Sequence, residues 1–483
     1  MSKNKNKPKK IKPEVLKGFR DYPPAEEMAR QKMISVFREV FESFGFSPLQ
    51  TPALEKIETL KGADYGEDNL KTIFNFEGPD KVDMALRFEM TASLARFVAG
   101  NPELPLPFRR YQVGPVWRVD KPDPGRFREF TQFDIDSVGT ESYLADAEIM
   151  AAICQSFEKL GLPNYRIRYS NRKILNGLAK FTGIPDDQAG GVFRVIDKLD
   201  KQGIESVKLE LGLGRKDRSG DLIPGLNLPE DQIATLEKFL NLQKFSSDSL
   251  TAAAELLAGV PEAEEGIAEL RQIAGFLENL DVPSNKAQVD LTIVRGLGYY
   301  TGPVFETVLD DIPEVGSVFA GGRYDGLVER FLGRKIPATG ASAGIDRLLA
   351  AMMMRKMIDY QDTISEVLVT VMDRERLPEY IGILNYIRSQ GLKAKIFLGT
   401  TKNLTKQLKY ADRTGIPAAV ILGSDEFENN QVTIKNLIAG KVQAQEVTDR
   451  EDWLKAENIQ KTIPRDDMIE YLRDLLKKSR NRQ

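Results

Sequence analysis

One short segment in the first third of the chain gathers side chains that could do chemistry. Residues 111–117 alternate as an incoming strand, residues 121–125 carry the prolines and glycine of a turn, and residues 127–136 alternate as an outgoing strand. The segment therefore predicts an antiparallel hairpin, with Arg118 just after its first strand. Polar side chains ordered along the outgoing strand, beside Arg118, could line a site rather than fill a core.

Strand parity sorts the outgoing strand into two sets of side chains, because residues two apart share a face. One face is predicted to carry Arg126, Arg128, Phe130, Gln132, Asp134 and Asp136. The other face is predicted to be more apolar and to carry Phe127, Glu129, Thr131, Phe133 and Ile135. Two interpretations stay open at this point: the polar face lines a site, or the hairpin is amphipathic with one solvated face.

The chain contains no histidine, which excludes several catalytic strategies. A Ser-His-Asp triad, a His-ligated zinc ion and an imidazole acid–base pair are all ruled out. The only cysteine, Cys154, lies in an apolar helical run and is expected in the core, so a disulfide within the chain or a cysteine metal cluster is ruled out too. Catalysis must rest on carboxylates, Arg, Lys, Tyr, Ser, Thr or a bound metal.

A second candidate segment lies at residues 84–99. We expect a short strand that ends near Phe88 and a helix that begins near Thr91, whose hydroxyl suits a helix cap. Glu89 and Thr91 would then lie at a strand-to-helix turn, a frequent place for ligand-binding side chains. A simple capping motif is the alternative.

A third candidate region begins at residue 289. Residues 289–295 and 303–308 are expected to form strands on either side of a glycine-rich turn that holds Arg295 and the pair Tyr299–Tyr300. Residues 340–347 are expected to run from a strand or tight turn into a helix. Arg347 would lie near the start of that helix.

The whole sequence lacks the usual glycine-rich nucleotide motifs. It contains neither the phosphate-loop lysine motif nor the dinucleotide fingerprint. A nucleotide site would therefore rely on arginines on a sheet.

Length and charge set broader limits. The 483 residues predict about three domains, and the formal net charge of −3 means that any nucleic-acid contact must come from local basic patches. No apolar run approaches membrane-spanning length and the N-terminus lacks a secretory apolar region, so the cytoplasm is the expected location. The lysine-rich residues 1–17 predict a solvated tail, with an RNA-contacting arm as the alternative.

The remaining elements follow from hydrophobic periodicity. Residues 25–44 predict a helix that stops at Gly45, and its apolar stripe belongs either to the core or to a subunit interface. Residues 175–286 predict an inserted helical domain without a group of residues that could form a catalytic or binding site. Residues 364–460 alternate strands with helices, which predicts an open α/β sheet. The other expected elements are strands at 46–51, 166–172, 367–371, 394–397 and 418–422, and helices at 142–160, 377–390, 403–414 and from 465 onward.

The ordered motifs resemble those of the class II aminoacyl-tRNA synthetases. The helix and strand that end at Pro52, the Arg118 hairpin and the segment 340–347 are similar to the three class signatures. More specifically, three peptides resemble the histidyl-tRNA synthetase family: Leu-Arg-Phe-Glu-Met-Thr at 86–91, Val-Arg-Gly-Leu-Gly-Tyr-Tyr at 294–300 and Ala-Gly-Gly-Arg-Tyr-Asp-Gly-Leu at 320–327. The resemblance covers about residues 18–460. Gly298 and Met90 depart from the family pattern, at positions whose side chains carry no chemistry.

The resemblance implies an α+β fold. It consists of an antiparallel-sheet catalytic core with a helical insertion, followed by a C-terminal α/β anticodon-binding domain. The implied domains are a basic tail (1–17), the catalytic core (18–174 and 287–360) interrupted by the insertion (175–286), the anticodon-binding domain (361–460) and a C-terminal helix with a basic tail (461–483). The implied assembly is a homodimer without membrane attachment.

The implied reaction joins L-histidine to the 3′ end of tRNA(His) through a histidyl-adenylate, with ATP and Mg²⁺. Arg118 and Arg295 are the implied catalytic residues, at the histidine carboxylate and the α-phosphate. The implied ATP-binding residues are Arg118, Arg126, Phe130 and Arg347. The implied histidine-binding residues are Glu89, Met90, Thr91, Arg118, Gln132, Asp136, Arg295, Tyr299 and Tyr300. No metal ligand from the protein is implied.

Two rival functions remain. One is a non-catalytic regulatory relative of the family, such as the regulatory subunit of ATP phosphoribosyltransferase; such proteins lack the anticodon domain and usually the key arginines. The other is a class II enzyme for another amino acid. Asp136, Tyr299 and Tyr300 argue against the second rival.

Overall fold

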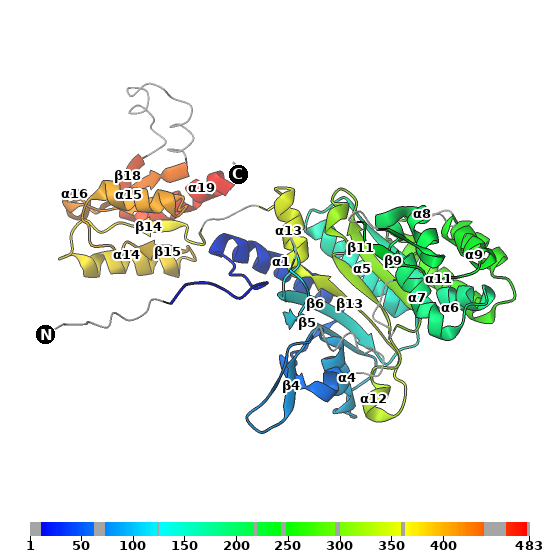
Figure 1. Cartoon of the computed structure of the whole chain (residues 1–483). Helices are drawn as coiled ribbons and strands as arrows, with labels where there is room; N and C mark the ends of the chain where they lie inside the picture. Colours follow the sequence, from blue (N-terminus) through cyan, green and yellow to red (C-terminus); the bar gives the residue numbers. More distant parts are fainter. Residues whose placement is uncertain are drawn as a thin grey trace. The chain divides into compact units, whose positions relative to one another are not determined.

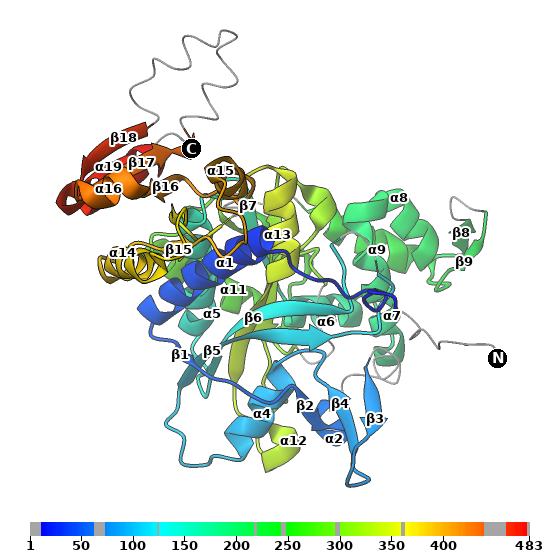
Figure 2. The same cartoon turned by 90° about the vertical axis from the view of Figure 1, so that its left-hand side faces the viewer.

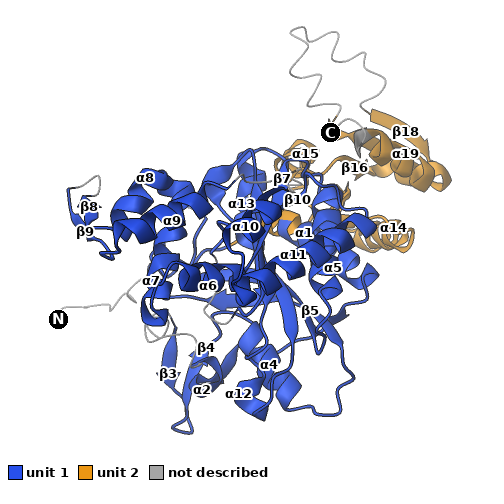
Figure 3. Cartoon of the chain, turned by 90° about the vertical axis from the view of Figure 1, so that its right-hand side faces the viewer, with its two compact units in different colours: residues 1–21, 30–357 blue, residues 22–29, 358–483 orange. Residues whose placement is uncertain are grey.

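The computed structural model divides the chain into two compact units. One unit comprises residues 1–21 and 30–357, and the other comprises residues 22–29 and 358–483 (Figure 3). Each unit is described by itself. The residues described are 11–61, 73–122, 125–216, 220–242, 248–294, 300–358, 363–438 and 460–480.

The larger unit is built on an eight-stranded sheet with the order β1-β5-β6-β13-β12-β11-β7-β10. Strands β5, β6, β13 and β11 of this sheet are labelled in Figure 1. All neighbouring pairs from β5 to β7 are antiparallel, and the outermost strands β1 and β10 pair in parallel. The strands are β1 (Ser47–Pro48), β5 (Phe108–Trp117), β6 (Glu129–Val138), β7 (Tyr165–Asn171), β10 (Ala287–Val289), β11 (Pro303–Leu309), β12 (Phe319–Arg323) and β13 (Ala338–Gly344). The predicted hairpin is confirmed as β5 and β6.

Helices and a small sheet flank this sheet on two sides. Helices α1 (Pro24–Ser43) and α5 (Leu144–Lys159) lie on one side of the hairpin, and helix α4 (Thr91–Ala99) lies on the other (Figure 2). The small sheet β2-β4-β3 lies on the same side as α4. Its strands are β2 (Leu54–Lys56), β3 (Asn75–Glu77) and β4 (Asp83–Leu86). The short elements of this unit are α2 (Ile57–Leu60), α12 (Glu329–Leu332) and the 3₁₀ helix η2 (Pro313–Val315), and α13 (Ile345–Met354) follows β13.

Aromatic packing fixes which face of the hairpin is buried. Phe133 of β6 is fully buried, with its ring centroid 5.8 Å from that of Phe37 and 5.1 Å from that of Phe41, both on α1. Ile135 of the same face is fully buried as well. The apolar stripe of α1 therefore packs as core within its own chain, which decides between the two interpretations of that stripe. Gly45 ends the helix region as predicted, with a φ of +79° that suits glycine.

The segment 175–286 is mainly helical and belongs to the larger compact unit. Its helices are α6 (Arg172–Phe181), α7 (Asp186–Ile196), α8 (Leu199–Leu211), α9 (Glu230–Leu240), α10 (Asp248–Leu256) and α11 (Pro261–Asn279). A two-stranded sheet, β8 (Gly214–Lys216) and β9 (Leu222–Pro224), adds to them.

Two expected strands are wrong in extent. The strand expected at 46–51 is limited to Ser47–Pro48. The strand expected at 289–295 corresponds to β10, which ends at Val289. The carboxylate of Asp290 accepts hydrogen bonds from both the backbone N–H and the hydroxyl of Thr292, and these local bonds favour a turn over a continued strand.

The smaller unit contains a five-stranded sheet of order β15-β14-β16-β17-β18. Its first three strands are parallel, as the α/β pattern predicts, and β17 and β18 add antiparallel pairs. The strands are β14 (Val367–Val369), β15 (Ala394–Ile396), β16 (Ala418–Ile421), β17 (Gln431–Asn436) and β18 (Gln460–Pro464). The helices are α14 (Leu377–Ser389), α15 (Leu404–Arg413), α16 (Ser424–Glu428), the 3₁₀ helix η3 (Arg465–Asp467) and α19 (Met468–Arg480). In the described part of the chain, no helix is both long and apolar enough to cross a membrane.

We expect Phe133→Ala to lower the free energy of unfolding by about 3–5 kcal/mol, because it opens a cavity among the rings of α1 and β5. Phe130→Ala, on the opposite face of the same strand and only half-buried, should cost clearly less. Chemical denaturation of both variants checks this. Equal losses would contradict the assignment of the buried face.

Candidate active site

The polar face of the hairpin is a cross-strand row of buried side chains. Arg110 lies directly opposite Asp136, and Gln112 lies opposite Asp134. On the other flank of β6, Ser342 of β13 lies opposite Asp134. All these side chains are buried or nearly so. The interpretation of an amphipathic hairpin with one solvated face is therefore wrong, because its polar groups lie inside the protein.

Asp136 is a deeply buried member of this row, at 2% exposure. Its Oδ1 accepts a hydrogen bond of 2.5 Å from the hydroxyl of Tyr324, and its Oδ2 lies 2.8 Å from Nη2 of Arg110. Burial raises the pKa of Asp136, while Arg110 and the Tyr324 hydrogen bond oppose that rise. A carboxylate has about four acceptor positions, so a further donor can still bind it.

Asp134 is a second buried carboxylate on the same face. Its Oδ2 is 3.7 Å from Nη2 of Arg110, a longer contact than that of Asp136. Burial raises the pKa of Asp134 to about 7, with Arg110 and a hydrogen bond from Ser342 opposing the rise and Asp136 adding to it. Ser342 also accepts a hydrogen bond of 2.6 Å from Nε2 of Gln132. Polar contacts therefore run without a break along β6 from Gln132 to Asp136.

Gly340 makes room for the Asp136 carboxylate. It lies opposite Asp136 on β13, and a Cβ atom there would be 1.9 Å from Asp136 Oδ1. Any side chain at this position would push the carboxylate away from Tyr324. Glycine is thus required at position 340 because a larger residue would collide with Asp136, and not because the backbone adopts a conformation that only glycine tolerates.

The strand-to-helix turn at 87–92 differs from its prediction in one respect. The expected cap by the Thr91 hydroxyl is wrong: the carboxylate of Glu89 accepts from the backbone N–H groups of Thr91 and Ala92, at 2.5 and 2.8 Å. The longer carboxylate can reach both amides at the positive end of the helix dipole. The side chain of Met90 is fully buried.

A buried arginine anchors this turn against the hairpin. Arg87 donates from Nε to the carbonyl of Pro115 at 3.0 Å and from Nη1 to that of Thr51 at 2.9 Å. The backbone N–H of Trp117 donates to the carbonyl of Arg87 at 3.0 Å. Glu89 is therefore brought beside the end of β5.

Arg118 lies at this junction. Its Nε donates to the carbonyl of Phe88 at 3.0 Å, and its guanidinium carbon is 5.1 Å from the centroid of the Phe130 ring. The Phe130 ring thus stacks near Arg118, a cation–π contact that the sequence did not indicate. Arg126 is exposed and pairs with Asp120 at 2.6 Å.

Arg347 is the third residue of α13, as expected, and donates from Nη1 to the carbonyl of Ser317 at 2.8 Å. Its neighbour Asp346 accepts from the backbone N–H of Thr131 at 2.6 Å. Arg30 of α1 contacts both, with 2.6 Å to the Thr131 hydroxyl and 3.5 Å to Asp346. This network ties the start of α13 to the strand that carries Phe130 and Gln132.

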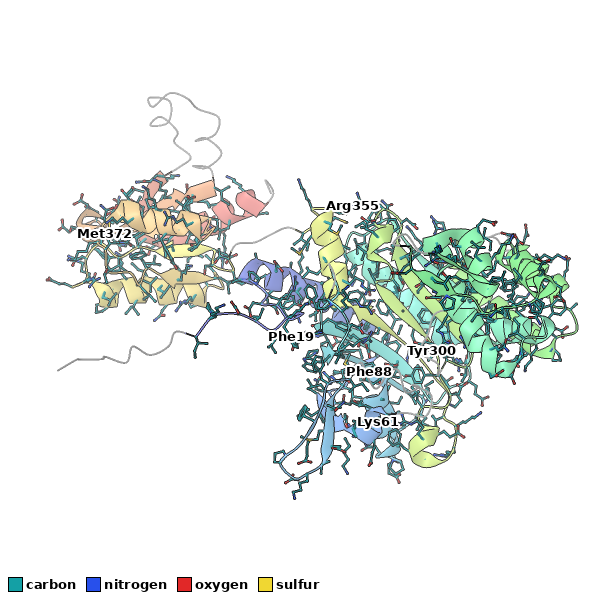
Figure 4. All side chains as sticks on the ribbon, in the orientation of Figure 1. Phe19, Lys61, Phe88, Tyr300, Arg355 and Met372 are labelled. Atoms are coloured by element: carbon teal, nitrogen blue, oxygen red, sulfur yellow. The ribbon has the colours of Figure 1, made fainter. Side chains whose placement is uncertain are left out.

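Three residues of the expected site were assigned to the glycine-rich turn. Arg295 and Tyr299 lie outside the described residues. Tyr300 is half-buried and packs against the apolar cluster that includes Tyr324, and a Cβ on Gly322 would be 3.0 Å from its ring. Figure 4 marks Phe88 and Tyr300, which belong to this part of the larger unit.

Two residues that contact Asp136 directly were absent from the expected set: Arg110 and Tyr324. Tyr324 lies within the peptide 320–327 that resembles the family, so the sequence could have indicated Tyr324 as a site residue. The sequence did not indicate a role for Arg110, because its contact with Asp136 depends on the register of the two hairpin strands.

An antiparallel sheet with arginines along one polar face and no phosphate loop defines the core of a class II aminoacyl-tRNA synthetase. Residues 18–348 match the family model described as "Histidyl-tRNA synthetase", and residues 366–475 match "Anticodon binding domain". The chain belongs to the histidyl-tRNA synthetase family. The predicted α+β fold class and family are therefore confirmed.

Individual relatives agree with this assignment. A histidine–tRNA ligase of Paracoccus denitrificans is 42% identical over 99% of this chain and 100% of the relative, and one of Rhizobium leguminosarum is 40% identical over 99% and 97%. The crystal structure of histidyl-tRNA synthetase from Nostoc superposes with a TM-score of 0.80 at 30% identity, covering 96% of this chain and all of that one. The activity of the chain is the ligation of histidine to tRNA, so the two rival functions are set aside.

We expect Gly340→Ala to lower kcat/KM for histidine by about 100-fold, because a displacement of about 1 Å in a positioning group has that cost. The matched control is Gly275→Ala on α11, where an added Cβ meets no atom within 4 Å. Steady-state kinetics of both variants test this. Unchanged kinetics in the Gly340 variant would show that the position of Asp136 does not matter.

Asp134 should also make stability depend on pH. Because the folded state keeps a proton that the unfolded state loses above its ordinary pKa of 3.8, this group stabilises the fold at low pH, and its contribution is lost between about pH 4 and pH 7. Asp134→Asn should therefore gain stability relative to the unsubstituted protein as pH rises through this window, by up to about 1.4 kcal/mol per pH unit. Denaturation curves of both proteins measure the difference, and a constant difference would contradict it.

Proposed function

We propose that the polar row on β6 holds histidine and that the arginines at its end activate the histidine carboxylate with ATP. The observation that carries this proposal is the continuous run of contacts from Gln132 to Asp136, on the face of the hairpin that also meets Arg118 and Glu89. The substrate supplies its own nucleophile, so no catalytic histidine or serine is needed. The protein must instead stabilise charge in an in-line phosphoryl displacement.

The α-amino end of histidine is assigned to Glu89, Thr91 and Gln132. Glu89 caps α4 through the backbone N–H groups of Thr91 and Ala92, and its carboxylate has the charge that complements an ammonium group. Met90, whose side chain is buried, is assigned through its backbone. The ring is assigned to Asp136 and Tyr300, with Tyr299 beside them. A pocket built to hydrogen-bond the ring rejects analogues, because its polar groups would otherwise lose their partners.

ATP is assigned to the arginine side of the row. Arg118 and Arg295 are proposed to hold the α-phosphate, where negative charge develops as pyrophosphate leaves. Arg126 is proposed to bind the γ-phosphate. To do so, it must break its exposed ion pair with Asp120. The adenine is proposed to lie between Phe130 and Arg347, whose elements are tied together by Asp346 and Thr131.

Mg²⁺ is proposed to enter on the phosphates of ATP, because this ion commonly binds through substrate phosphates and water. When bound there, it supplies charge neutralisation. Over the described ranges, no group of three acidic or cysteine side chains is placed to hold a metal ion.

The domain limits inferred from the sequence, a homodimer and a cytoplasmic location belong to the same proposal, on the basis of family membership. In the smaller unit, the face of α15 that carries Lys406 and Lys409 is exposed, while Gln407 is buried and bonded to the backbone of Val371. We assign this lysine face to the phosphate backbone of tRNA(His).

ATP–pyrophosphate exchange tests the proposed site. We expect exchange with histidine only. Arg118→Lys should lower kcat by about 100- to 1,000-fold, since lysine keeps the charge but loses the planar fork. Arg295→Ala should largely abolish exchange. The control is Arg109→Lys in β5, on the opposite face, where Arg109 pairs with Glu148. Near-normal exchange in both site variants would refute the arginine roles.

A further inference from the structure

A short segment ahead of helix α1 lies against the end of the β5–β6 hairpin. We call residues 16–20 the entry segment. A hydrogen bond of 3.0 Å from the backbone N–H of Phe19 to the carbonyl of Leu16 closes a turn in it. Gly18 is the third residue of that turn and has a φ of +86°, which suits glycine there. None of the residues of the entry segment is assigned to a substrate in the proposed site.

The backbone of Arg128 connects the entry segment to Arg118. Arg118 is the first residue after β5, and Arg128 is the last residue before β6. The backbone N–H of Arg128 donates to the carbonyl of Gly18 at 2.7 Å. The carbonyl of Arg128 accepts from the backbone N–H of Arg118 at 2.9 Å. A displacement of Gly18 is therefore passed to Arg118 through a single residue.

Side chains add to this connection. The guanidinium group of Arg128 donates from Nε to the carbonyl of Asp120 at 3.2 Å and from Nη1 to the carbonyl of Lys17 at 3.5 Å. The guanidinium carbon of Arg20 lies 4.8 Å from the centroid of the Phe127 ring, a cation–π contact. The entry segment therefore holds both of the residues that precede β6.

The entry segment has little freedom to move away from the hairpin. The ring of Phe19, which Figure 4 labels, meets the ring of Phe74 edge to face with 6.3 Å between centroids. A Cβ atom on Gly18 would lie 2.8 Å from Cγ and 2.9 Å from Cδ of Arg128, and 3.0 Å from Cγ of Pro122. The Cγ and Cδ atoms of Arg128 lie close to its backbone, so an added methyl group would push the residue itself.

We propose that the entry segment positions Arg118 for adenylate formation, with Gly18 and Arg128 as its positioning residues. This inference rests on the proposed contact between Arg118 and the α-phosphate. The bond to Arg128 sets where the side chain of Arg118 begins, and from there it reaches the carbonyl of Phe88 and the ring of Phe130. Stabilisation of a developing charge depends on donors that are already in place, so a small shift of Arg118 slows the reaction.

The test is single-turnover formation of histidyl-adenylate by the full-length protein, with saturating enzyme in excess over ATP so that slow variants are resolved. Gly18→Ala should lower the rate constant about 10- to 100-fold, because a displacement of about 1 Å has a cost of that order. The matched control is Gly45→Ala, whose φ of +79° is equally unfavourable for alanine but whose added Cβ meets no atom within 4 Å. Both variants should lose similar stability in chemical denaturation. Equal rate constants in the two variants would overturn the proposal.

A second single variant adds no atom to the turn. Arg128→Met removes the side-chain bonds to Lys17 and Asp120, and it should lower the rate constant about tenfold, the cost of one charged hydrogen bond. A normal rate constant in folded Arg128→Met would also count against the proposal.

Double variants test the route of the effect. Arg128→Ala removes the Cγ and Cδ atoms that the new Cβ would meet, so adding Gly18→Ala to it should cost less than about threefold. In an Arg118→Met background, Gly18→Ala and Arg128→Met should each cost less than about threefold, because no guanidinium group is left to position. A merely structural role would let the effects multiply, and such multiplication in the Arg118→Met background would overturn the inference.

The Arg118→Met variant by itself identifies which assignment fails. If it forms adenylate at a near-normal rate, the proposed contact of Arg118 with the α-phosphate is wrong, and the present inference is refuted with it. If Arg118→Met loses its rate while Gly18→Ala and Arg128→Met keep theirs, the role of Arg118 stands and the present inference alone is refuted.

Discussion

The ion pair between Arg110 and Asp136 joins the two strands of the central hairpin from inside the protein. Both groups are almost completely removed from water, so each depends on the other and on the Tyr324 hydroxyl for compensation. This requirement constrains the register of β5 and β6. A slip of one residue would move Asp136 to the face that Phe133 occupies, where it would lie among the aromatic rings of α1. The register of β5 and β6 therefore places the polar groups of the site on one face and the aromatic core on the other.

Segments far apart in the sequence converge on this hairpin through a few polar ties. Asp346 bonds the backbone of Thr131 and contacts Arg30, so that helix α1, strand β6 and helix α13 are held together on the buried face. Arg87 makes the corresponding tie on the polar face, where it binds the carbonyl of Pro115. Arg118, which is proposed for catalysis, thus follows directly after the end of strand β5. Such rigid elements suit a reaction that depends on positioning charge.

A synthetase without histidine is consistent with this chemistry. In the proposed site the reacting carboxylate and phosphate come from the substrates, and arginine, tyrosine and carboxylate side chains are assigned to the contacts. Family membership over residues 18–348 and the anticodon-binding match at 366–475 carry the functional assignment.

The sequence by itself determined the hairpin, the polar and apolar faces of β6, the helix stop at Gly45 and the absence of imidazole chemistry, because these features depend on local periodicity, turn residues and composition. The tertiary structure decided which groups meet. The pairing of Arg110 with Asp136, the capping of α4 by Glu89 in place of Thr91, and the need for glycine at 340 all depend on strand register and on contacts across the sheet. Local pattern carries no information about such distances, because the loops between strands set the register and residues far apart in the chain supply the partners.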